Sequence, residues 1–327
     1  MSPRVPAVDV IDWLLDPTES DPAIRWQVMR DLLGLPEAEW SAERDRIEAE
    51  GWGAHLLALE DADGQWAGGA YFPSDLDWDS PEAQPGQGQP WTATTYSLAQ
   101  LRDFGLDPAS SWAQRAVRLV GENCRWEHDG EPYWDGEVEP CINGITVANG
   151  AYFGVDVSVI VDRLLRERLD DGGWNCEAVN GSVRTSYDTT INVLEGLLEY
   201  ELATAEKAEV TEARRAAEEF LLERELFLRL STGEPADDDF LLLRNPWRWQ
   251  YDVLRALDYF RRAGGDPDPR TGRAIEHLLS KRGEDRKWLL DKNPKGRTWF
   301  DVDDGPGLPS RWVTMRAMRV LDWAGVE

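Results

Sequence analysis

Six segments of the sequence share a pattern of apolar and polar positions that is typical of helices. They span residues 23–33, 92–104, 141–153, 188–200, 248–260 and 312–323. When the first residue of each segment is counted as position zero, position six is apolar in all of them and position nine is apolar or glycine. This spacing places the two positions on one helical face. We therefore expect six apolar helices that pack against one another.

The stretches between these segments are charged on one side and apolar on the other, as in AIEHLLSKR. They cover residues 40–59, 111–120, 157–169, 210–230 and 270–279. Such a pattern is typical of helices with one face in water. The repeating unit is therefore an inner apolar helix plus an outer amphipathic helix, and six such hairpins can close into a ring. No repeated strand signal competes, so we expect one closed, all-α domain over residues 1–327.

Position two of the repeat is polar in all six segments, which is unusual beside so many apolar positions. The residues are Arg25, Thr94, Asn143, Thr190, Gln250 and Thr314. If they face the middle of the ring, aromatic residues near the inner-helix starts surround them: Trp26, Trp91, Tyr96, Tyr187, Trp247, Trp249, Tyr251 and Trp312. An aromatic cavity with a few fixed polar groups is the usual form of a small-molecule site, and aromatic faces stabilise cations. The alternative is that these side chains fill the middle as ordinary core.

Composition narrows the classes of partner. The 327 residues carry 62 Asp plus Glu against 35 Lys plus Arg, a formal charge of −27. Such a charge repels nucleic-acid phosphates and anionic lipids. No export signal and no apolar run of transmembrane length is visible, and three cysteines are an odd number for a disulfide framework. These features predict a soluble cytoplasmic protein with a small-molecule ligand, no nucleic acid and no transmembrane segment.

Tryptophan is abundant, at 17 residues, and part of it recurs in a motif. HLLALEDADGQW, ending at Trp66, and RLLRERLDDGGW, ending at Trp174, place Gly-x-Trp after an outer helix, and a third copy keeps only Trp288. This motif resembles the QW repeat of squalene-hopene and other class II terpene cyclases, although Glu60 and Arg168 stand where that family has Gln. The resemblance implies an (α/α)6 toroid of six inner and about six outer helices. Protein prenyltransferase β-subunits share this fold, in which the Trp stacks on the end of an outer helix.

An acidic motif, Asp301-Val302-Asp303-Asp304, carries the strongest candidate chemistry. It resembles the DxDD motif with which class II terpene cyclases protonate an alkene or an epoxide. Clustered carboxylates in an apolar cavity raise one pKa, so that a neutral acid persists. The resemblance implies that Asp303 is the proton donor and that Asp301 and Asp304 support it. An exposed acidic loop is the alternative, because a Gly/Pro-rich stretch over 305–309 follows where that family continues into a helix.

A second candidate site is Glu139-Pro140-Cys141 together with Asp188. It resembles the zinc site of protein prenyltransferases, in which Asp-x-Cys starts one inner helix and His starts the next; here Glu and Asp replace Asp and His. Cys141 and Asp188 also occupy position zero of successive segments. Cys176 is a further ligand if its loop folds over the cavity mouth. Zinc is thus a possible cofactor, and a buried, unligated Cys141 is the alternative.

These features favour a terpene cyclase-like protein that acts on an isoprenoid or another apolar small molecule by acid-initiated cyclisation or isomerisation. A zinc-dependent prenyltransferase-like protein, a non-catalytic toroid that binds a ligand or a protein, and a carbohydrate-active α/α barrel are the alternatives. A diphosphate-bearing substrate requires a local cationic patch in this acidic chain. Arg25, Arg184, Arg248 and Arg311, near the inner-helix starts, are the candidates.

Overall fold

The computed structural model describes residues 10–84, 87–205 and 207–326, and this part of the chain is helical without any β-strand. The predicted all-α class is therefore confirmed. No helix of the described residues is long and apolar enough to cross a bilayer. The α-helices are α1 (Val10–Leu15), α2 (Pro22–Asp31), α3 (Glu37–Asp45), α4 (Gly51–Leu57), α5 (Thr94–Phe104), α6 (Ser111–Asn123), α7 (Pro140–Tyr152), α8 (Ser158–Glu167), α9 (Tyr187–Ala203), α10 (Ala208–Glu223), α11 (Val253–Ala263), α12 (Gly272–Ser280) and α13 (Arg311–Ala324).

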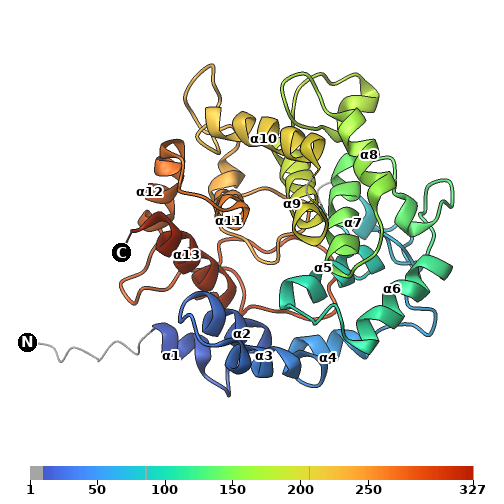
Figure 1. Cartoon of the computed structure of the whole chain (residues 1–327), viewed down its shortest axis with the longest axis horizontal. Helices are drawn as coiled ribbons and strands as arrows, with labels where there is room; N and C mark the ends of the chain where they lie inside the picture. Colours follow the sequence, from blue (N-terminus) through green and yellow to red (C-terminus); the bar gives the residue numbers. More distant parts are fainter. Residues whose placement is uncertain (1–9, 85–86, 206, 327) are drawn as a thin grey trace, which may run out of the picture.

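Two sets of helices can be distinguished by their position (Figure 1). Helices α2, α5, α7, α9, α11 and α13, called the inner helices below, surround the middle of the molecule, and α4, α6, α8, α10 and α12 lie outside them. Each inner helix contacts the next one along the chain, and α13 contacts α2. The contacts between inner helices therefore form a closed circuit.

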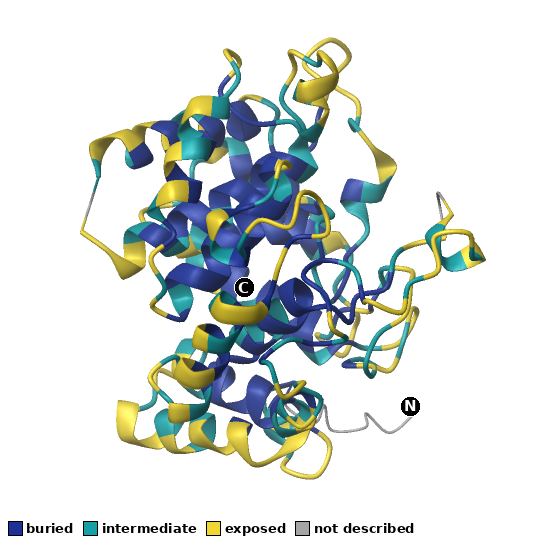
Figure 2. Cartoon of the chain, turned by 90° about the vertical axis from the view of Figure 1, so that its right-hand side faces the viewer, coloured by how far each residue is buried: buried dark blue, intermediate teal, exposed yellow. Residues whose placement is uncertain are grey.

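Burial follows the same division (Figure 2). In α7, every residue from Ile142 to Ala151 is buried, whereas α8 buries only Ile160, Val161 and Leu164. A helix buried on all sides needs no polar face, and a helix on the surface needs one. This difference explains why the inner segments are apolar and the outer segments are amphipathic in the sequence.

The predicted inner segments agree with the observed helices to within a few residues, except in α11. The apolar pattern predicts a start at residue 248, but α11 begins at Val253. The carboxylate of Asp252 caps the helix by accepting a hydrogen bond from the backbone N–H of Arg255 at 2.8 Å. The Arg255 guanidinium also donates to the carbonyl oxygens of Arg248 and Gln250, at 3.1 and 2.8 Å, and holds these residues outside the helix.

Two outer segments also differ from their predictions: α10 ends at Glu223 rather than at residue 230, and the segment predicted over residues 40–59 is divided. Residues 40–59 form α3, a short 3-10 helix and α4 rather than one helix. The break lies at Gly51, whose φ of +64° belongs to the left-handed region that favours glycine. A side chain at this position would also collide with the Asp21 carboxylate.

Helices α7 and α9 make the most extensive contact between two helices in the described part of the chain, and two glycines permit it. A Cβ on Gly144 would lie 2.5 Å from the backbone of Asn192. A Cβ on Gly196 would lie 2.4 Å from the carbonyl oxygen of Gly144. Because no side chain fits between the two backbones at this point, the sequence requires glycine at both positions.

The three tryptophans of the repeated motif make the same pair of hydrogen bonds. The Trp66 indole N–H donates to the carbonyl of Leu56 in the last turn of α4 at 2.9 Å, and its backbone N–H donates to Thr94 Oγ1 of α5 at 3.1 Å. The pairs recur at Trp174, with Leu164 and Thr190, and at Trp288, with Leu278 and Thr314. Each Trp therefore supplies a hydrogen-bond donor to a carbonyl at the end of the preceding outer helix and joins that end to the next inner helix.

Candidate functional site

The polar residues at position two do not form a ring around an open space. Thr94, Thr190 and Thr314 are fully buried, and their hydroxyls bond to the tryptophan loops described above. Asn143 pairs with the backbone of Glu137 in the same way, accepting from its N–H and donating to its carbonyl at 2.7 Å. The prediction that these residues face a cavity is therefore wrong. These side chains are polar because each one forms a hydrogen bond with the backbone of the loop that precedes its helix.

The remaining predicted binding residues are divided among different places. Arg25 pairs with Glu43, and Gln250 lies in the loop before α11. Tyr187 and Tyr251 belong to the packed core around α9 and α11 or its edge. Trp249 packs against the other core, which includes residues of α2 and α5, and its carbonyl accepts a hydrogen bond from Asn192. Two others, Trp26 and Trp312, line a cavity in the middle of the molecule, and Trp91 lines a second cavity beside it.

The central cavity has a volume of about 310 Å³, and every inner helix contributes side chains to its lining. This size lies at the lower end of the range for small-molecule sites. Aromatic side chains, among them Trp26, Trp247 and Trp312, form part of the wall. The rest of the lining is mainly charged, so the expectation of a mainly apolar lining is wrong.

Arginine dominates this lining, although the chain as a whole is strongly acidic. Four carboxylates face the cavity, from Asp103, Glu195, Glu199 and Asp258. Nine arginines face it as well: Arg30, Arg44, Arg102, Arg248, Arg255, Arg261, Arg262, Arg316 and Arg319. The cavity therefore carries an excess of positive charge. A low-dielectric pocket with such an excess attracts anions.

Most of these guanidinium groups have partners within the protein. Arg255 forms a bidentate ion pair with Glu195, with N–O distances of 2.8 and 2.7 Å. Burial would raise the pKa of Glu195, but Arg255 holds it below the ordinary value. Arg319 pairs with Asp31 at 2.7 Å, although its Nε is buried without a partner among the described residues.

Arg248 is the cavity arginine that combines burial with the absence of any ion pair to a carboxylate of the described residues. Arg44 and Arg102 also lack such a pair, but they are only half-buried and donate to the Gly105 carbonyl and to Asn149 Oδ1, at 2.6 and 3.1 Å. The Arg248 side chain is 5% exposed, and its Nε has no hydrogen-bond partner in the described part of the chain. The guanidinium lies 5.6 Å from the ring centres of both Trp91 and Tyr96, and Nη2 makes one long bond of 3.4 Å to Gln100. Burial lowers the pKa of Arg248 to about 10. A buried, unpaired charge of this kind is costly unless a ligand compensates it.

Beside the central cavity lies a second one of about 290 Å³, called the side cavity below. The two cavities share Gln100, Pro246 and Arg248 in their linings. Asp303 reaches the side cavity and accepts a hydrogen bond from Asn245 Nδ2 at 2.5 Å. Burial raises the pKa of Asp303 to about 6, although hydrogen bonds with Ser310 and Asn245 act in the opposite direction.

The acidic motif therefore places one carboxylate inward and two outward. Asp301 and Asp304 are exposed, and Asp301 also lies at the edge of the side cavity. The hydrogen bonds of Asp303 are with Asn245 and Ser310, and Asp304 contributes only a repulsion that raises the Asp303 pKa further. Asn245 in turn accepts from Arg316 Nη1 at 2.7 Å, which fixes its amide. The support that was expected from the two neighbouring aspartates thus comes from Ser310 and from an asparagine 58 residues earlier in the chain.

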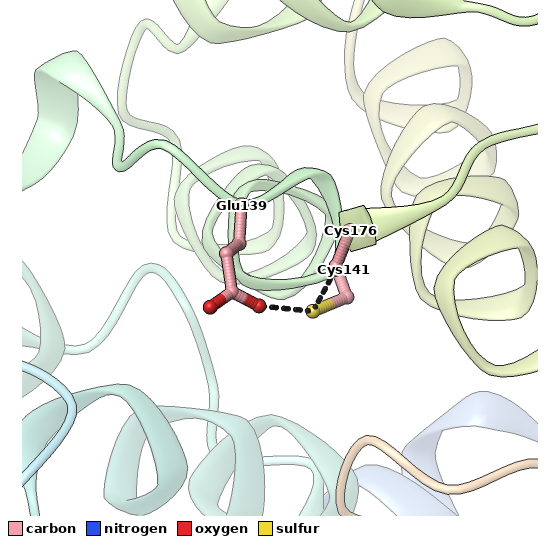
Figure 3. Close-up of side chains that lie close together, drawn as sticks. All are labelled: Glu139, Cys141 and Cys176. Carbon is pink, nitrogen blue, oxygen red and sulfur yellow. Dashed lines mark hydrogen bonds between the residues drawn. The ribbon is translucent and has the colours of Figure 1, made fainter. Parts of the chain in front are cut away.

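The predicted metal ligands lie in two places. Glu139, Cys141 and Cys176 converge, with one ligand atom from each within 4.8 Å of the others (Figure 3). Asp188 is not in this group, because its Oδ1 accepts a hydrogen bond from the backbone N–H of Tyr251 at 2.7 Å. Hydrogen bonding with Cys176, burial and the nearby Glu139 all raise the pKa of the Cys141 thiol. Two thiols and a carboxylate are suitable ligands for a thiophilic divalent cation.

Most of the residues that line the central cavity were not predicted from the sequence. Of the four arginines singled out, only Arg248 reaches it; Arg25 and Arg311 make contacts elsewhere, and Arg184 is exposed. The available signal was the presence of charged residues inside otherwise apolar inner segments, as at Arg255, Arg316 and Arg319. No local motif indicates that these residues meet, because they come from different helices.

Comparisons with models of known protein families and with curated protein sequences find no match to this chain. The site must therefore be interpreted from its own geometry.

Proposed function

We propose that the chain is a closed α/α toroid whose central cavity binds a small molecule that carries a phosphate or diphosphate group. The circuit of contacts between inner helices, with an outer layer of amphipathic helices, supports the toroid. The recurring Trp–Leu and Trp–Thr hydrogen bonds support its relation to the QW-repeat fold.

The single observation that most directly supports a phosphate-bearing ligand is the environment of Arg248. This residue is buried and unpaired in the described structure, and its Nε lacks a partner beside a cavity rich in arginine. Guanidinium groups bind phosphate oxygens with directed, charge-assisted hydrogen bonds. A phosphate at this position would compensate the buried charge and occupy the free donors.

The aromatic part of the lining suits an apolar portion of the same ligand. Trp26, Trp247 and Trp312 reach the cavity, and Ile145 adds an aliphatic surface. Together with the resemblance to isoprenoid-binding proteins, this lining favours a prenyl diphosphate over a simple inorganic anion. A neutral hydrocarbon fits the lining poorly, because it would leave the buried Arg248 guanidinium without a compensating charge.

Calorimetric titration of the purified full chain tests this function with three probes: inorganic pyrophosphate, a prenyl diphosphate and the corresponding prenyl alcohol. We expect both diphosphates to bind, the prenyl compound more tightly, and the alcohol to bind weakly. Equal affinity for the alcohol and the prenyl diphosphate would contradict the role of the arginines. Binding without any product on prolonged incubation would indicate a non-catalytic toroid.

Asp303 supports a second candidate function, acid catalysis on a ligand that extends into the side cavity. Its carboxyl is held largely neutral at mildly acidic pH, because burial raises its pKa to about 6. A neutral carboxylic acid in a cavity is able to donate a proton. Substitution of Asp303 by Asn preserves the shape and removes this proton; conversion of the prenyl diphosphate at an unchanged rate by that variant would exclude the catalytic role.

A further inference from the structure

The start of α7 and the loop before α9 bring two thiols together (Figure 3). Pro140 occupies the first turn of α7 and Glu139 is its N-cap residue, so Glu139 and Cys141 are fixed on either side of the helix start. Cys176 is the first residue of the short 3-10 helix Cys176–Asn180. The two Sγ atoms lie 2.9 Å apart, and Cys141 Sγ lies 3.6 Å from Glu139 Oε2.

We propose that Glu139, Cys141 and Cys176 bind one thiophilic divalent cation of the Zn²⁺ type. The donor set of two sulfurs and one carboxylate oxygen is selective for such ions over Mg²⁺ and Ca²⁺, which prefer oxygen ligands. Three protein ligands leave the fourth tetrahedral position open, as in zinc sites that bind water or a substrate.

The observed spacing requires only a small adjustment around an ion. With Zn–S bonds of about 2.3 Å in tetrahedral geometry, two thiolates are about 3.8 Å apart. The thiols therefore have to separate by roughly 0.9 Å, within the reach of a side-chain rotation at Cys176. The distance of 3.6 Å between Cys141 Sγ and Glu139 Oε2 is already one that two ligand atoms of the same ion adopt.

A neighbouring hydroxyl orients the third ligand. Thr189 of α9 donates to Cys176 Sγ at 3.5 Å and accepts from the Cys176 backbone N–H at 3.3 Å. Partners of this kind outside the ligand set fix the direction of metal ligands. Asp188, the adjacent residue on α9, is committed to the backbone of Tyr251, so the structure assigns the third position to Cys176.

Cobalt titration of the reduced, metal-free full chain tests this site directly. Co²⁺ bound by thiolates gives a charge-transfer absorption that carboxylate-bound Co²⁺ lacks, so the readout does not depend on any catalytic activity. We expect one equivalent of Co²⁺ to produce this band and one equivalent of Zn²⁺ to displace it. In the loaded protein, the metal should also protect Cys141 and Cys176 from alkylation.

Substitutions distinguish the residues that bind the metal from residues that only lie nearby. Cys141→Ser and Cys176→Ser should each weaken Co²⁺ binding by roughly 100-fold, since loss of even an outer partner weakens metal sites about 10–100-fold. Asp188→Asn should bind as the wild type does, because an amide oxygen still accepts from Tyr251. Glu139→Gln serves as a milder variant if a serine variant fails to fold by circular dichroism, and should weaken binding without abolishing the thiolate band.

Three results of the cobalt titration would overturn the site. One is the absence of a thiolate band in fully reduced, folded protein, and another is an unchanged band in Cys176→Ser. The third is a loss of binding in Asp188→Asn equal to that in the cysteine variants. Isolation of the chain with Cys141 and Cys176 joined as a disulfide that resists reduction under native conditions would also count against metal binding.

Discussion

The backbone N–H of Trp288 donates a hydrogen bond to the hydroxyl of Thr314 at 3.0 Å, and both residues are almost fully buried. The Trp288 indole N–H meanwhile donates to the Leu278 carbonyl at 2.8 Å. One tryptophan thus joins the end of α12 to the start of α13. The same pair of hydrogen bonds recurs at Trp66 and Trp174, so it is a repeated way of joining an outer helix to the next inner helix in this fold.

Replacement of Thr314 by Val tests how much the hydrogen bond between Trp288 and Thr314 contributes to stability. Valine fills the same space but cannot accept the hydrogen bond, so the N–H of Trp288 is left buried without a partner. We expect the free energy of unfolding to fall by about 1–3 kcal/mol, as measured by urea denaturation. Thr204 is exposed, so water can replace the bond that its hydroxyl donates to the Tyr200 carbonyl, and its replacement by Val should change stability by only about 0.5 kcal/mol. Equal effects at the two positions would show that the Trp288–Thr314 bond contributes nothing specific.

The ion pair between Glu195 and Arg255 gives a second prediction. Arg255 is 3% exposed, and it also holds the carbonyls of Arg248 and Gln250. Replacement of Glu195 by Ala leaves this buried charge uncompensated and should cost about 3–5 kcal/mol of unfolding free energy. The measurement is again chemical denaturation at neutral pH.

An exposed pair provides the control for this ion-pair prediction. Arg118 and Glu122 face solvent on α6, and Glu122→Ala should cost only about 0.3–0.5 kcal/mol. If Glu195→Ala is no more destabilising than Glu122→Ala, the Arg255 guanidinium is not held by Glu195 in solution.

The helical fold was largely predictable, because its signals are local. The period of apolar residues located the inner helices, and Gly-x-Trp marked the ends of outer helices. The start of α11 was not predictable from periodicity, since Leu254 and Leu257 fit the pattern in either case. A single cap at Asp252 and the long-range bonds of Arg255 decide where the helix begins.

The candidate sites were predictable only where their residues are close in sequence. Asp303 and the Glu139–Cys141 pair were predicted from short motifs, and Cys176 was predicted as a ligand on the condition that its loop folds over the cavity. The arginine cavity was not predictable, because its lining residues come from seven helices and the loop before α11 and share no motif. The repeat pattern also predicted that the polar position-two residues face a cavity. A sequence does not distinguish a polar side chain that hydrogen-bonds to the backbone of a loop from one that binds a ligand.

Asp303 gives a prediction about pH. Its pKa of about 6 exceeds the ordinary value of 3.8, so the folded protein retains a proton that the unfolded chain releases. The stability contributed by neutral Asp303 is complete below the ordinary pKa and is lost as pH rises through about 6, by about 3 kcal/mol in total. Asp303→Asn does not titrate, so its stability relative to the wild type should increase with pH. Denaturation at about pH 4 and about pH 8 measures this difference.

Exposed Asp304 offers the matched control for this pH dependence. Asp304→Asn should not show a comparable rise in relative stability between the two pH values. The titration of the Asp303 carboxyl, followed by carbon NMR, should have its midpoint near pH 6. A midpoint close to 3.8 would show that the side cavity is well hydrated and that the Asp303 carboxyl does not retain its proton at mildly acidic pH.

The central claim is that the arginine-lined cavity binds a phosphate-bearing ligand through Arg248. Calorimetric titration with inorganic pyrophosphate, comparing the wild type with Arg248→Gln and Arg184→Gln, tests it most directly. Arg184 is exposed and outside the cavity, so its variant should bind as the wild type does. Loss of a charge-assisted bond at Arg248 should weaken binding by roughly 10–100-fold. Equal affinity of Arg248→Gln and the wild type, or no binding by either, would contradict the proposed function.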